Sequence, residues 1–182
     1  MSNEIELQVK ELQEKLGQLQ AKQAKDQISI IVFSGDLDKV LAAMIIATGA
    51  TAMDMKVKMF FTFWGTAMLR DKHKTAKGKD FMSKMFGFML PKGSTKLKLS
   101  KLNMMGMGTE MLKSLMKKKR VASLEEMIQT AAELGVEINV CEMSMDLMGF
   151  KREEIIDYPH LSYCGVGTYL TDAEESRIQL FI

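Results

Sequence analysis

Two cysteines are the residues of this chain whose type and position best suit covalent chemistry. Cys141 ends the apolar, β-branched stretch at residues 136–141, and a segment of helical character follows it. A thiol between a strand and a helix start lies near backbone N–H dipoles, which favour the nucleophilic thiolate. The same position suits a small buried side chain, because free cysteines are commonly buried. The local sequence therefore leaves two interpretations of Cys141, a nucleophile and a core residue.

Cys164 is the second thiol of the chain. It ends a short stretch at residues 162–164 that we interpret as a strand, and Gly165 follows it. Adjacent strands of a parallel sheet end close together. Cys164 could therefore resolve a bond formed at Cys141, as in a dithiol oxidoreductase, or it could simply fill space at a strand end. The sequence leaves both roles open.

Strand and helix patterns alternate from residue 28 to residue 182. Ser123 and Glu126 form a capping-box pattern and Gly135 follows the periodic stretch, which predicts a helix between them. Thr109 is the expected N-cap of the helix before it. The alternation predicts an α/β fold around a mainly parallel sheet. The expected strands are residues 28–33, 57–64, 136–141, 162–164 and 177–182.

Small and polar residues follow several of the expected strands. In open α/β sheets, binding groups gather at the carboxyl ends of the strands. Backbone N–H groups at such turns can hold an anion near a thiol. The residues that we expect to line this pocket are Ser34, Gly35, Asp36, Trp64, Gly65, Met143, Ser144, Gly165 and Gly167.

Motifs for tightly bound cofactors do not occur. The turn at Gly165 and Gly167 lacks the G-x-G-x-x-G pattern, and the chain has no GxxxxGK[ST] phosphate loop. His73 and His160 stand alone, without a cysteine at ligand spacing. We therefore expect no metal and no organic cofactor.

The composition is that of a folded domain. The chain has 182 residues, of which 47% are hydrophobic and 26% charged, which is enough to build a packed core. The first 26 residues are polar and no run of 18 apolar residues occurs, so we expect no signal peptide and no membrane span. Two cysteines cannot form a disulfide framework. We expect a soluble, cytoplasmic protein with reduced thiols.

Residues 1–26 predict a helix outside the α/β domain, which we place at residues 27–182. Its apolar residues are spaced by four and three, which is heptad spacing. This narrow stripe suits either a short coiled coil or a helix packed on its own domain. The stripe consists of Ile5, Val9, Leu12, Leu16 and Leu19.

Positive charge is concentrated in one segment. Residues 70–120 hold 15 lysines and arginines against three acidic residues, whereas the rest of the chain holds 10 against 20. Residues 79–108 have no clean period, which favours short helices and loops in an insertion at about residues 73–108. One interpretation of this segment is a solvated charged face over a Met-rich core. The other is a surface that docks an acidic partner or an anionic membrane, because Phe and Met interleaved with Lys suit interfacial binding. No nucleic-acid recognition module occurs, so we expect no nucleic-acid partner.

Several segments in order resemble the DsrE/DsrF/DsrH-like family, particularly its DsrE-like members. They are IIVFSGDLD, KMFFTFWGTAML, EEMIQTAAELGVEINVCEMSMDLMGFKREEI and YCGVGTYLTDAEESRIQLFI. The most specific is VCEMSMDLMGFKREEI, in which a cysteine at a strand end precedes a helix and a glycine. The resemblance covers the chain except the N-terminal helix, and the basic stretch corresponds to an insertion in some members.

The resemblance implies a flavodoxin-like α/β fold of five strands with helices on both faces, usually assembled as homo- or hetero-oligomers. It also implies sulfur trafficking, in which a cysteine takes up sulfane sulfur as a persulfide or thiosulfonate and passes it to a partner carrier. By position, Cys141 is similar to the acceptor cysteine of the family. Cys164 falls where the family often has no cysteine.

Two functional hypotheses follow. The first is a sulfur carrier or sulfurtransferase that loads Cys141 and delivers sulfur to a partner protein. The alternative is a non-catalytic scaffold that recruits partners, or makes peripheral contact with an anionic membrane, through the N-terminal helix and the insertion at residues 73–108.

Overall fold

A five-stranded, all-parallel sheet forms the centre of the structure, a computed structural model that describes residues 2–21 and 24–182. The strand order is β4-β3-β2-β1-β5, so the chain's last strand pairs with its first. This sheet confirms the predicted α/β class, with every strand pair parallel. The strands are β1 (Lys25–Val32), β2 (Lys56–Phe61), β3 (Glu137–Cys141), β4 (Leu161–Cys164) and β5 (Ser176–Phe181).

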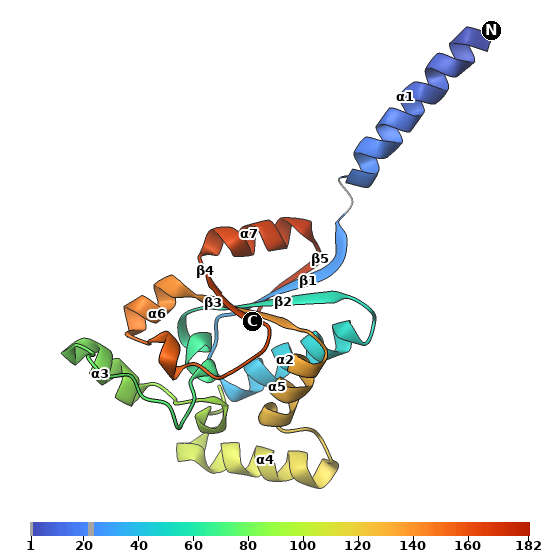
Figure 1. Cartoon of the computed structure of the whole chain (residues 1–182). Coiled ribbons are helices and arrows are strands. Elements are labelled where there is room, and N and C mark those ends of the chain that lie inside the picture. The colour runs from blue at the N-terminus through green and yellow to red at the C-terminus, as the bar shows by residue number, and fades with distance from the viewer. Residues whose placement is uncertain (1, 22–23) are drawn as a thin grey trace.

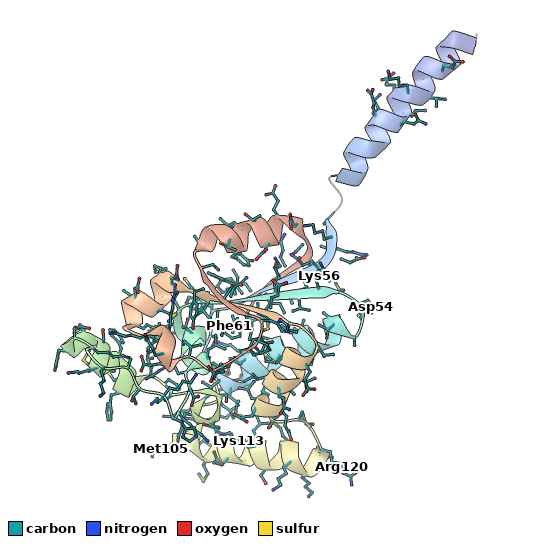
Figure 2. The ribbon with its side chains drawn as sticks, viewed as in Figure 1. Asp54, Lys56, Phe61, Met105, Lys113 and Arg120 are labelled. Atoms are coloured by element: carbon teal, nitrogen blue, oxygen red, sulfur yellow. The ribbon has the colours of Figure 1, made fainter. Side chains whose placement is uncertain are left out.

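Helices cover both faces of the sheet, as expected. Helix α7 (Val166–Glu175) lies on one face, and α2 (Leu37–Thr51) and α5 (Leu124–Glu133) pack on the other (Figure 1). The α2/α5 face is apolar and carries the main core. Phe61, labelled at the centre of Figure 2, is fully buried there. Burial of apolar area on this face is the main stabilising contribution to the fold.

The sheet face under α7 contains a largely buried polar network. Asp172 of α7 accepts hydrogen bonds from Lys58 Nζ at 2.5 Å and from Asn139 Nδ2 at 3.3 Å. The hydrogen bond to Asp172 raises the pKa of Lys58 above its ordinary value. These contacts satisfy polar groups that would otherwise be costly to bury. Polar strand residues on this face include Gln27, Ser29, Lys58, Asn139 and Ser162.

Helix α5 has the predicted start and stop. The Ser123 hydroxyl accepts a hydrogen bond from Glu126 N at 3.2 Å, and the Glu126 carboxylate accepts one from Ser123 N at 2.7 Å. Gly135 has a φ of 75°, the left-handed conformation that suits a residue after a helix. The capping-box prediction is therefore confirmed.

The prediction for Thr109 is wrong. Helix α4 (Met107–Lys119) begins two residues earlier, after Gly106 in a left-handed conformation. The Thr109 hydroxyl instead accepts from Leu99 N at 3.1 Å and donates to Asn103 Oδ1 at 2.8 Å. The Thr109 side chain therefore binds the preceding loop and does not cap a helix.

Strand β2 ends earlier than predicted. It stops at Phe61, and Phe63 adopts a left-handed φ of 44°. The 3₁₀ helix η1 (Phe63–Leu69) follows, so Trp64 and Gly65 lie in a helical turn beyond the strand. This turn carries the chain into the basic segment.

The basic segment consists of short helices and loops, as predicted. After Arg70 come α3 (Phe81–Met89), η2 (Ser94–Lys96) and η3 (Met104–Gly106), followed by α4. No residue of α3 is buried. By contrast, Leu97 is only 1% exposed and belongs to the main core. The middle of the segment is therefore part of the domain, while α3 lies on its surface (Figure 1).

The N-terminal segment forms helix α1 (Ser2–Ala21), as predicted, and it extends away from the sheet in Figure 1. The predicted end at residue 26 is wrong, because Lys25 and Asp26 belong to β1. Val9 and Leu12 are exposed. The side chains of Ile5, Leu16 and Leu19 lie outside the described part of the chain, so the heptad stripe stays a prediction. Among the described residues, no helix is both long and apolar enough to cross a membrane.

Candidate functional site

The two thiols lie side by side at one edge of the sheet. Cys141 and Cys164 end the neighbouring strands β3 and β4 and are partners in their parallel register. Each cysteine lies two residues beyond a polar residue, Asn139 or Ser162, that takes part in the network under α7. Because side chains alternate along a strand, both thiols face the α7 side of the sheet.

The two thiols differ in exposure. Cys141 is 2% exposed, whereas Cys164 is partly exposed. Burial raises the pKa of the Cys164 thiol above its ordinary value, and the charges of Asp172 and Glu142 act in the same direction. A hydrogen bond with Thr168 opposes this shift without cancelling it. Cys164 is therefore held as a neutral thiol at physiological pH.

Ser144 fixes the helix that follows Cys141. It lies in α6 (Glu142–Met148), is fully buried, and forms a hydrogen bond of 2.9 Å with the Thr62 hydroxyl. Its Oγ also accepts a hydrogen bond from Phe63 N at 2.9 Å. These bonds join α6 to the end of β2, so a shift of α6 is coupled to the turn that carries Trp64.

A cavity of about 860 Å³ opens at the carboxyl ends of β1 and β2. Four of the predicted pocket residues line it together: Ser34, Gly35, Asp36 and Trp64. Gly35 is required by close packing, because a Cβ atom there would lie 2.7 Å from the carbonyl oxygen of Trp64. Residues 87–92, 96 and 98 of the basic segment complete the cavity lining. That these four residues belong to a functional pocket stays a prediction.

The other predicted pocket residues lie elsewhere. Gly65 is buried against β1, where a Cβ atom would lie 2.2 Å from the carbonyl oxygen of Val32. Met143 is exposed on α6, and Gly165 and Gly167 are exposed at the start of α7. None of them lines the 860 Å³ cavity, and neither do the two cysteines. The candidate site is therefore two adjacent regions of one sheet edge, a thiol pair and a cavity.

Sequence reasoning missed the buried cluster that holds the cavity wall. The Arg70 guanidinium, 3% exposed, donates hydrogen bonds to the carbonyl oxygens of Gly87 at 3.1 Å and of Leu90 and Pro91 at 3.3 Å. Glu154 lies 3.7 Å from Arg70 and also pairs with Lys79. The only sequence signal was an arginine ending the apolar stretch FWGTAML.

Comparison with known proteins agrees with these structural features. A model of the family described as DsrE/DsrF/DrsH-like matches residues 24–181. The chain belongs to this family. The family predicted from the sequence motifs is therefore confirmed, and the match includes both cysteines and the basic segment.

Two relatives align with this chain over most of their own length. The chain is 47% identical over 154 residues to the uncharacterized protein YrkE of Bacillus subtilis, covering 85% of this chain and 95% of YrkE. It is 35% identical over 163 residues to the sulfur carrier protein DsrE2 of Allochromatium vinosum, covering 86% of this chain and 98% of DsrE2. A sulfur-trafficking role is supported by this second likeness and by the family.

A solved structure is similar at a lower level. The crystal structure of the ychN protein from E. coli matches with a TM-score of 0.49 and 9% identity, over 86% of this chain and 98% of that one.

Proposed function

We propose that this protein is a sulfur carrier in which Cys141 takes up sulfane sulfur and passes it to a partner protein. The observation that carries the proposal is the position of Cys141. It ends β3 inside the family-matched region, directly before α6 and beside a second thiol. The likeness to a sulfur carrier at 35% identity supports the same chemistry.

The transfer needs only thiol chemistry. The Cys141 thiolate attacks the outer sulfur of a donor persulfide, the donor S–S bond breaks, and the donor leaves as a thiolate. Cys141 then carries the sulfur as a persulfide, and attack by the partner's thiolate on its outer sulfur returns Cys141 to the thiolate. No net oxidation occurs. The raised pKa of the Cys164 thiol lowers its thiolate fraction, which disfavours loading of sulfur on Cys164.

Apolar side chains around the thiol edge offer a surface for the partner. Met143 and Leu147 of α6 are 55% and 60% exposed, and Val166 and Leu170 of α7 are 61% and 59% exposed. Such side chains on the two helices nearest the thiols suit a protein interface or a second copy of this chain. Docking there would bring a partner's thiol to the edge where β3 and β4 end.

The test is intact-mass analysis after incubation with a persulfide donor and, separately, with tetrathionate. The wild type, Cys141→Ser and Cys164→Ser are run side by side. We expect the Cys164→Ser variant to gain sulfur like the wild type and the Cys141→Ser variant to gain none. Loading that survives in Cys141→Ser, or is lost only in Cys164→Ser, would overturn the assignment of Cys141.

A second candidate function rests on the surface of α3. Its apolar side chains Phe81, Met82, Met85, Phe88 and Met89 are 37–92% exposed in the most basic part of the chain. This combination suits peripheral contact with an anionic membrane. Co-sedimentation with vesicles of anionic or neutral lipid, for the wild type and for Phe81→Ser/Phe88→Ser, tests it. Equal recovery with both kinds of vesicle contradicts it.

A further inference from the structure

The cavity at the carboxyl ends of β1 and β2 has no part in the thiol chemistry proposed above. From its lining we infer that it binds a nucleotide-like ligand, with a flat ring against Trp64 and a di- or triphosphate chain among the lysines of the rim. The cavity volume of about 860 Å³ is within the range of small-molecule sites. Its place at strand ends is where open α/β sheets bind ligands.

The charges of the cavity favour a polyanion. Four lysines line it, Lys39, Lys92, Lys96 and Lys98, against the single carboxylate of Asp36. Asp36 is already paired, with Lys39 Nζ at 3.0 Å and the Ser34 hydroxyl at 2.9 Å. Within the described chain, the other three lysines form no ion pair with a carboxylate. Three cations thus face the cavity without a protein partner, and ammonium groups bind phosphate as point charges.

The apolar lining favours a flat ring over a bare inorganic anion. Trp64 is 46% exposed and Phe88 is 92% exposed at the cavity. Phe33, which also lines the cavity, packs on Phe63 next to Trp64 with a centroid distance of 5.3 Å. The half-exposed indole of Trp64 lines the cavity, and it offers a stacking surface for a nucleobase-like ring.

The wall of the cavity is held in place before any ligand arrives. Arg70 fixes the carbonyl groups of Gly87, Leu90 and Pro91 from behind, as described above. The lysine-bearing loop is fastened where Lys98 O accepts a hydrogen bond from Leu37 N at 2.8 Å. Preorganised walls reduce the entropic cost of binding. No phosphate-loop motif occurs, so the lysine side chains supply the phosphate contacts.

Intrinsic fluorescence measures binding directly, because Trp64 is the only tryptophan of the chain. The full chain is titrated with ADP, with pyrophosphate and with adenosine. We expect a saturable change of Trp64 emission with ADP, competition by pyrophosphate, and at least roughly tenfold weaker binding of either half alone.

Two matched charge variants separate a site from a diffuse basic surface. Lys92→Ala/Lys96→Ala/Lys98→Ala should weaken ADP binding roughly tenfold or more, whereas Lys117→Ala/Lys118→Ala/Lys119→Ala in α4 removes the same charge and should leave it unchanged. Circular dichroism and the Tm verify that both variants fold. Trp64→Ala, followed by calorimetry, should lose the preference for ADP over pyrophosphate.

Three results would overturn the inference. They are the absence of any saturable signal or heat with ADP, equal loss of binding in both lysine variants, and pyrophosphate binding as tight as that of ADP. Cys141→Ser should bind ADP like the wild type. The ADP-binding measurement is therefore independent of whether Cys141 carries sulfur.

Discussion

Cys141 and Cys164 are register partners at the ends of two neighbouring parallel strands, yet only Cys164 is open to solvent. The inner thiol lies at the junction of β3 and α6, and the outer one lies at the junction of β4 and α7. In the proposed sulfur carrier, delivery of sulfur to Cys141 would therefore depend on the size of the donor or on a movement of α6.

The burial of Cys141 predicts strong size selectivity for reagents. In Cys164→Ser, a bulky maleimide should label native Cys141 roughly tenfold or more slowly than it labels the urea-unfolded chain. A small alkylating reagent should show a much smaller difference. Labelling kinetics followed by mass spectrometry measure both rates. Equal rates for the bulky reagent in the native and unfolded chain would show that the thiol is open.

The raised pKa of Cys164 predicts its alkylation profile. A thiol whose pKa lies above the ordinary value of 9.0 is mostly protonated at neutral pH, and its reactivity increases only as the pH rises through the shifted pKa. In Cys141→Ser, the midpoint of the rate against pH should lie above that of the unfolded chain. Thr168→Val removes the hydrogen bond that opposes the shift, so its midpoint should move higher still. A midpoint below that of the unfolded chain contradicts this prediction.

The polar network under α7 should contribute to stability. Asp172→Ala leaves Asn139 without its carboxylate acceptor and Lys58 with only the longer ion pair to Glu137, at 3.7 Å. We expect a loss of about 2–4 kcal/mol in the free energy of unfolding, measured by urea denaturation. Asp26→Ala removes an ion pair with Arg177 whose two side chains are 72% and 68% exposed. That control should cost less than about 1 kcal/mol. An equal loss of unfolding free energy in Asp172→Ala and Asp26→Ala would show that the buried network stabilises the fold no more than an exposed ion pair does.

Arg70 should control the order of the cavity wall. Arg70→Met removes the donors that hold the chain at Gly87–Pro91, and Glu154 keeps its ion pair with Lys79 and its hydrogen bond from Lys151 N. We expect trypsin to cleave the lysine-rich insertion roughly tenfold faster, while the sheet remains folded by circular dichroism. Lys84→Met changes an exposed cation of α3 and serves as the control. Unchanged proteolysis in Arg70→Met would mean that other contacts hold the wall.

The elements that could be predicted from the sequence are those that depend on residues close together in the chain. The capping box at Ser123 and the β-branched run of β1 need only nearby residues, and both were predicted correctly. Ser34 and Trp64 line one cavity, because parallel strands end at a common edge, but the two cysteines do not line it.

Features that depend on distant partners could not be predicted. The sequence left open whether Cys164 lies beside Cys141, because no local pattern specifies that β3 and β4 are neighbours in the sheet. Thr109 looked like a helix cap, but its hydroxyl is used by Leu99 and Asn103 across a loop. The role of Arg70 depends on carbonyl groups up to 21 residues away in a segment without periodicity.

The parallel sheet has a practical consequence for attaching the protein to anything else. Helix α1 leads into β1 at the amino edge of the sheet, whereas Ile182 lies at the carboxyl edge, where its carbonyl oxygen accepts a hydrogen bond from Phe33 N at 2.8 Å. A purification handle or surface anchor placed before Ser2 leaves the thiols and the cavity facing outward. The same handle appended to Ile182 would lie at the carboxyl edge of the sheet, and it would disturb the hydrogen bond between Ile182 and Phe33, a residue that lines the cavity.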